Sequence, residues 1–194
     1  MSDLDEAKTA LAELESDPSE THLIGNIVDE ISDPDAFNYL IENLQPYRSE
    51  FFEDTDALLS LFRYAIGAGV KVPKIEFQKL SEWLESGLKD HDIYGKSTVC
   101  VEMAAMYRKE TYPDDNDLSN IEDAELVKHW VDLAVEYADD ADEFLNIIEA
   151  VSEPHQGLYL GDKSWGKELL EQIVSKTDSD VSKKVAASGK KLLD

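Results

Sequence analysis

Apolar residues recur at helical spacing along almost the whole chain. Ten helical segments can be distinguished, and in most of them apolar residues stand at positions i, i+3, i+4 and i+7, which is the pattern of one buried face of an amphipathic helix. No segment alternates polar and apolar residues in the way that a half-buried strand does. The sequence therefore predicts an all-α fold of about ten helices, which pair as five antiparallel hairpins.

The predicted hairpins follow one another without a sharp boundary, which indicates a single repeat domain over residues 1–194. A helical hairpin cannot cover its own apolar face, so neighbouring hairpins must stack. We expect a short right-handed α-solenoid or a repeat-like helical domain. An acidic insertion loop, residues 111–123, follows the third hairpin. The five hairpins are predicted at residues 2–31, 33–69, 73–110, 122–152 and 162–193.

Capping residues mark the first helix ends. Ser2 and Asp5 have the spacing of a capping box, in which each side chain accepts a hydrogen bond from the backbone of the other. Asp17 and Pro18 should end the first helix and begin the second.

The same pair of residue types, Asp33 and Pro34, should begin the third helix. Pro46 should end it, and residues 47–54 are predicted to form a loop before a fourth helix.

Tryptophan spacing supports a repeat. The intervals are 47 residues between Trp83 and Trp130 and 35 between Trp130 and Trp165, and the last two rings are predicted near the start of their helices. The longer interval exceeds the shorter by about the length of the segment 112–123. We interpret the three rings as packing residues between repeats. The alternative is a ligand-binding groove, which would need exposed and aligned rings.

The net charge of -25 is concentrated in two blocks, residues 1–60 with -14 and residues 111–155 with -13. Nucleic acids and anionic membranes are bound mainly by cationic surfaces, so direct binding of either is not expected. A basic protein partner would be attracted to the two acidic blocks. The alternative is that the acidic side chains only keep the helix surfaces soluble.

Two further features bear on location. No apolar run approaches the length of about 20 residues that crosses a bilayer, and the first residues lack the pattern of a signal peptide. The single cysteine, Cys100, agrees with a reducing compartment. We therefore expect a cytoplasmic protein.

The insertion loop contains Asp114, Asp115 and Asp117, which suggest either a calcium site or a solvated acidic surface that contacts a partner. With Asp114 as the first position, Leu118 and Ser119 stand where a calcium loop needs an oxygen ligand and a glycine. We therefore expect partner contact rather than metal binding.

No pattern indicates catalysis. Cys100 lies on an apolar helical stripe, where a thiol usually packs as a small hydrophobic group. Nucleophile elbows, phosphate loops and zinc-protease motifs are absent from the sequence. The histidines stand apart, with none at metal-ligand spacing: His22, His91, His129 and His155. We predict a non-enzymatic protein without a metal or cofactor.

A second acidic segment joins two strongly periodic helices, with four carboxylates between two aromatic rings. The carboxylates could simply stabilise the start of the second helix through its dipole. They could instead form a recognition turn for arginine or lysine of a partner, with the rings offering cation–π surface. The residues of this turn are Tyr137, Asp139, Asp140, Asp142, Glu143 and Phe144.

The segment Leu160-Gly161-Asp162-Lys163-Ser164-Trp165, followed by Leu169-Leu170, resembles a helix-opening motif of acidic bacterial helical-hairpin repeat proteins. Around Trp130 only the helix matches, because Asp123-Ala124-Glu125 replaces Gly-Asp-Lys. More broadly the chain resembles HEAT- and TPR-like α-solenoids, although it lacks the small-residue pattern of TPR repeats. The resemblance implies a scaffold and names no partner.

Our leading hypothesis is a protein–protein interaction scaffold that uses the acidic blocks 1–60 and 111–155. One version is an immunity or antitoxin protein that covers the cationic site of a basic toxin or nuclease. The alternatives are an acidic regulator that mimics nucleic acid and an enzyme with an unrecognised site.

Overall fold

The computed structural model describes residues 2–53, 74–91, 95–111, 124–153, 158 and 163–194. Every regular element within these ranges is helical and none is a strand, so the predicted all-α class is confirmed. The chain divides into two compact units, Met1–Tyr94 and Gly95–Asp194.

The N-terminal unit is built around the contacts of α1 with α2 and α3, and of α4 with α6. Its core is formed by large aliphatic and aromatic side chains, including Leu14, Ile24, Phe37 and Leu40. The elements of this unit are α1 (Asp3–Ser16), α2 (His22–Glu30), α3 (Pro34–Asn43), the 3-10 helix η1 (Gln45–Tyr47), α4 (Arg48–Glu53) and α6 (Lys74–Asp90).

Two of the predicted helix starts are confirmed. Ser2 caps α1, and both hydrogen bonds of the capping box with Asp5 are present. Asp33 caps α3 by accepting a hydrogen bond of 3.0 Å from the backbone N–H of Asp35, with Pro34 at the first helical position. These local motifs satisfy helix-end donors without help from distant residues, which is why the sequence reveals them.

The predicted role of Asp17 in starting the second helix is wrong. Helix α2 begins at His22, and Asp17 is instead the C-cap residue of α1. The Asp17 carboxylate accepts hydrogen bonds from the backbone N–H and the hydroxyl of Ser19, at 3.1 and 2.7 Å. This short-range bonding holds a turn, because it gives the backbone a partner that competes with helix formation.

Asp3 ties α1 to the start of α3. One of its carboxylate oxygens accepts from the backbone N–H of Ser32 at 2.6 Å, from the Ser32 hydroxyl at 2.9 Å and from the backbone N–H of Asp33 at 2.8 Å. Hydrogen bonds to the ionised form favour it, so these contacts, chiefly the backbone N–H of Ser32, hold the pKa of Asp3 below its ordinary value of 3.8.

The loop predicted at residues 47–54 is wrong. Residues Arg48–Glu53 form α4, in which Phe51 and Phe52 are buried. Both rings pack against Trp83 of α6. The centroid of the Trp83 ring lies 6.2 Å from that of Phe51 and 5.5 Å from that of Phe52. Burial of two large rings stabilises this short helix, although its own length would not. The fourth helix predicted from residue 54 or 55 lies outside the described residues.

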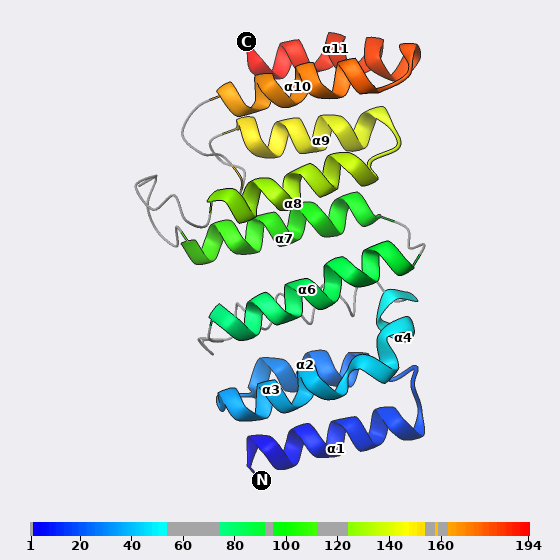
Figure 1. Ribbon diagram of the computed structural model, residues 1–194, viewed down its shortest axis with the longest axis vertical. Helices are drawn as coiled ribbons and strands as arrows, with labels where there is room; N and C mark the ends of the chain where they lie inside the picture. The colour runs from blue at the N-terminus through cyan, green and yellow to red at the C-terminus, as the bar shows by residue number, and fades with distance from the viewer. Residues whose placement is uncertain (1, 54–73, 92–94, 112–123, 154–157, 159–162) are drawn as a thin grey trace. The chain divides into compact units, whose positions relative to one another are not determined.

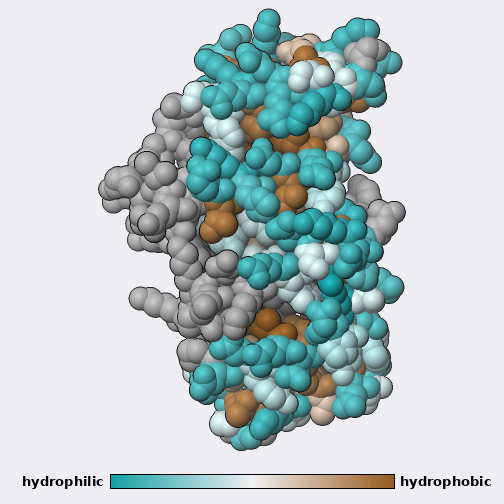
Figure 2. All heavy atoms as spheres, viewed as in Figure 1, coloured by the Kyte–Doolittle hydropathy of each residue, from teal (hydrophilic) through white to brown (hydrophobic). Residues whose placement is uncertain are grey.

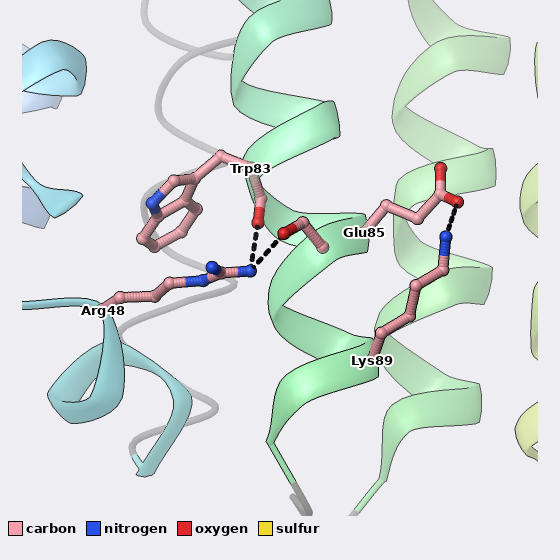
Figure 3. A network of polar contacts seen from close by, with 5 residues as sticks. Arg48, Trp83, Glu85 and Lys89 are labelled. Carbon is pink, nitrogen blue, oxygen red and sulfur yellow. Dashed lines mark hydrogen bonds and ion pairs between the residues drawn. The ribbon is translucent and has the colours of Figure 1, made fainter.

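Arg48 joins α4 to α6 by polar contacts. Its guanidinium donates to the hydroxyl of Ser86 at 2.7 Å and to the backbone carbonyl of Trp83 at 3.4 Å (Figure 3). It also lies 3.4 Å from a carboxylate oxygen of Asp90. Figure 3 shows the Glu85–Lys89 ion pair on the same helix, which is an i, i+4 contact at 2.7 Å.

In the C-terminal unit α7 packs most extensively with α8, and α9, α10 and α11 contact one another (Figure 1). The predicted stripe of α7 is confirmed, since Cys100, Met103 and Ala104 are fully buried. Lys163 precedes α10 and donates to the Leu192 carbonyl near the end of α11 at 3.0 Å. The helices are α7 (Lys96–Thr111), α8 (Ala124–Tyr137), α9 (Ala141–Ser152), α10 (Ser164–Lys176) and α11 (Ser179–Leu193).

Helix α8 contacts α7 more extensively than it contacts α9, although α9 follows it directly in the chain. The division between the units at residues 94 and 95 falls inside the hairpin predicted at 73–110. The five-hairpin solenoid and the single domain over 1–194 stay predictions.

The three tryptophans do not occupy equivalent helix positions. Trp130 is the seventh residue of α8, so its predicted place near a helix start is wrong, whereas Trp165 is the second residue of α10. These two helices start at residues 124 and 164, which are 40 residues apart, not 35. Trp130 is 2% exposed, whereas Trp83 and Trp165 are half-buried. A packing role is clearest for Trp130.

Replacing Asp3 by Asn should lower the midpoint of urea unfolding at neutral pH. Because the folded pKa of Asp3 lies below 3.8, its contribution to stability is present above that pH and is lost as the pH falls through the folded value. The difference between the two proteins should therefore shrink in acid. Glu13→Gln, on the exposed side of the same helix, serves as the control. A difference that stays constant with pH would contradict a role for the ionised carboxylate.

Replacing Gly87 by Ala should destabilise the N-terminal unit. A Cβ at this position of α6 would overlap the ring of Phe52, which is buried and cannot move away freely. We expect a loss of about 1–3 kcal/mol, as for other overpacked cores, although alanine is the better helix former. Gly189→Ala is the control, since its Cβ would meet the flexible end of Leu170 at 2.7 Å. Thermal unfolding followed by circular dichroism measures both.

Candidate partner-binding site

The turn between α8 and α9 holds most of the residues that the sequence singled out. Asp140 is the N-cap of α9, and its carboxylate accepts from the backbone N–H groups of Asp142 and Glu143 at 2.7 and 2.9 Å. Glu143 in turn accepts from the backbone N–H of Asp139 at 3.0 Å. Both carboxylates therefore satisfy backbone donors at the start of the helix.

Asp142 has a partner on another helix. Its carboxylate lies 2.7 Å from the ammonium group of Lys184 in α11. The hydrogen bond and the charge of Asp142 raise the pKa of Lys184 above its ordinary value. Both side chains are more than half exposed, so the pair contributes little to stability.

The two aromatic residues of the turn differ in their surroundings. The ammonium group of Lys96 lies over the Tyr137 ring, 5.3 Å from the ring centroid, which is a cation–π contact within the chain. Phe144 is 5% exposed and belongs to the core of the C-terminal unit. Asp139 is exposed, and its carboxylate makes no hydrogen bond or ion pair with any residue that the structure describes. Of the four carboxylates in the predicted recognition turn, that of Asp139 is the one without a described partner.

The other predicted contact residues, Asp114, Asp115 and Asp117, lie outside the described residues. Within the ranges that the structure does describe, no group of three or more His, Cys, Asp or Glu side chains is placed to hold a metal ion. Cys100 is fully buried.

A groove of about 690 Å³ opens beside this turn, between the last turns of α8 and α10. We call it the α8–α10 groove. Its floor is apolar and is made of side chains that are at least nine-tenths buried, namely Val135, Phe144 and Ile173. The remaining lining residues are Asp132, Glu136, Ala138, Gln172, Lys176 and Thr177.

The polar rim of the α8–α10 groove has few internal partners. Asp132 and Glu136 are exposed on α8, and Lys176 is exposed on α10. None of these three charged groups makes an ion pair with a described residue. Thr177 differs, because its hydroxyl donates to the carbonyl of Ile173 at 2.9 Å. The groove thus presents charged groups to solvent above an apolar floor.

Sequence reasoning identified Phe144 and missed the rest of the α8–α10 groove. The missed signal is a pair of polar residues one helical turn apart near the end of each helix: Asp132 and Glu136 on α8, and Gln172 and Lys176 on α10. Such i, i+4 pairs mark one face of a helix. They do not reveal which two helices face each other, and that requires the tertiary structure.

The described residues on the face seen in Figure 2 are predominantly hydrophilic. Figure 2 shows polar side chains over most of the face in view, with small and separate hydrophobic areas between them. No helix among the described residues combines the length and the apolar character that a bilayer crossing requires. No protein-family model, curated protein or solved structure matches the sequence.

Replacing Asp140 by Ala should destabilise the C-terminal unit by about 1 kcal/mol, because two backbone N–H groups of α9 lose their partner. Asp139→Ala removes the same charge from the neighbouring residue, whose carboxylate has no described partner, and should change stability much less. The measurement is the midpoint of urea unfolding of both variants. Equal losses would show that charge, not capping, is what Asp140 contributes.

Proposed function

We propose that the chain is a non-enzymatic scaffold that binds a basic protein through acidic side chains of the blocks 1–60 and 111–155. The observation that carries the proposal is that Asp132, Glu136 and Asp139 are exposed and that their carboxylates have no partner among the residues that the structure describes. Carboxylates that already cap helices or pair with lysines have fewer free oxygen lone pairs for a partner's cation. Uncommitted carboxylates on a surface are available to lysine or arginine.

The charge balance around these residues supports the same proposal. Residues 124–153 contain nine acidic side chains and one basic one, Lys128. Lys128 lies 3.5 Å from Glu125, an exposed i, i+3 contact. The acidic surplus makes a negative field that would steer a cationic partner toward this part of the chain and repel nucleic acid.

The N-terminal block contributes in a more limited way. In α1, Asp3 and Asp5 are engaged in hydrogen bonds within the unit, and these lower the pKa of both groups. Glu13 and Glu15 are exposed on the same helix. We infer that the exposed glutamates, not the capping aspartates, are the part of this block that attracts a partner.

An immunity or antitoxin role is the specific form of this proposal that we favour. An acidic protein that covers the cationic site of a toxin or nuclease binds quickly because opposite fields steer the encounter. A repeat-like helical scaffold and a cytoplasmic setting, which the single Cys100 favours, belong to the same proposal.

The test is affinity capture from native lysate on the immobilised chain at low salt, with the captured proteins identified by mass spectrometry. We expect a basic partner that moderate salt elutes, because salt screens exposed charges. The triple variant Asp132→Asn, Glu136→Gln and Asp139→Asn should lose this partner.

The matched control neutralises three exposed acids outside both blocks, Glu168→Gln, Glu171→Gln and Asp180→Asn, and should keep the partner. Both variants change the net charge equally, so the comparison separates position from total charge. A neutral partner that resists salt, or equal retention by both variants, would contradict the proposal.

A further inference from the structure

We infer that the α8–α10 groove is the seat of one amphipathic helix of the partner, with leucine-like side chains on the apolar floor and lysine or arginine along one edge. This inference rests on the proposed function and names the segment that the acidic surface would recognise.

The two carboxylates of the groove have the spacing of a helix. Asp132 and Glu136 are four residues apart on α8, which places them about 6 Å apart along the helix axis. Basic residues at i and i+4 of a partner helix have the same axial spacing. A helix that lies along α8 could therefore place one cation beside each carboxylate.

The end of α8 strengthens the preference for a cation. The groove lies beside the last turn of α8, where the final carbonyl groups of the helix carry partial negative charge. Helix α8 has no basic residue in its last turn, so nothing on that helix offsets this charge.

The floor explains why the ligand must also be apolar. Val135, Phe144 and Ile173 form a hydrophobic base, and a volume of about 690 Å³ holds a few side chains and not a domain. Insertion of two or three apolar side chains of one helix is the usual way in which a protein groove of this kind is filled.

Lys176 makes the groove selective. It stands on the α10 side of the groove, opposite the two carboxylates of α8, and it would repel a ligand that is basic on both edges. Gln172, on the same side, is neutral. The groove therefore favours a helix with basic residues on one edge over a uniformly cationic chain.

The test is direct binding of a fluorescently labelled synthetic helical peptide to the full chain, followed by anisotropy. The peptide carries leucines on its central face, lysines on one edge and glutamates on the other. The variant Asp132→Asn with Glu136→Gln should bind it about 10-fold more weakly, the loss expected for close charge pairs. Glu171→Gln with Asp180→Asn removes the same charge outside the groove and should alter the affinity less than about 2-fold.

A second variant keeps both carboxylates and occludes the groove. Ala138 is half-buried and lines the groove, so Ala138→Phe would occupy part of its space. We expect a loss of peptide binding similar to that of the charge variant, with an unchanged circular dichroism spectrum. A comparison peptide with serine in place of leucine should bind weakly to every variant, because it cannot use the floor.

The outcomes separate this inference from the proposed function. If neither groove variant weakens binding but Glu13→Gln with Glu15→Gln does, the groove is not the site and the acidic scaffold stands. If no acidic substitution changes the affinity, both are wrong. If the charge variant weakens binding and Ala138→Phe does not, the carboxylates attract the peptide from outside the groove and the inference fails.

Discussion

Burial of the apolar face of α8 is the constraint on which the candidate site depends. Val127, Trp130, Val131 and Ala134 follow one another at helical spacing and are at most 2% exposed. Once these side chains face the core, the geometry of the helix leaves Asp132 and Glu136 on its outer side. The carboxylates of the α8–α10 groove are thus presented by the same packing that stabilises the unit.

Acidic residues serve two purposes in this chain. Some are structural, because aspartates at N-cap positions accept hydrogen bonds from backbone groups that would otherwise lack partners, as in α3, α9 and α11. Others, such as Glu136, stand on exposed helix faces without a partner in the described chain. The acidic side chains therefore fall into two groups. Those without a described partner are the ones available to bind another molecule.

Local and distant interactions explain which predictions succeeded. The capping residues Ser2 and Asp33 could be predicted, because the backbone donors they satisfy lie two or three residues away. The turn held by Asp17 was misread, because an aspartate followed by proline can either cap a helix or close a turn. Helix α4 was missed because its two phenylalanines are stabilised by Trp83, some thirty residues later in the chain.

The sequence by itself determined the helical class, most helix positions and the uneven distribution of charge, since these follow from periodicity and from contacts within a few residues. Tertiary structure alone decided that α8 packs chiefly on α7, that three carboxylates of the predicted recognition turn are already bonded, and that the ends of α8 and α10 enclose a groove. The physical reason is that hydrophobic burial is not directional. An apolar stripe requires a partner, and only the packed chain decides which partner it is.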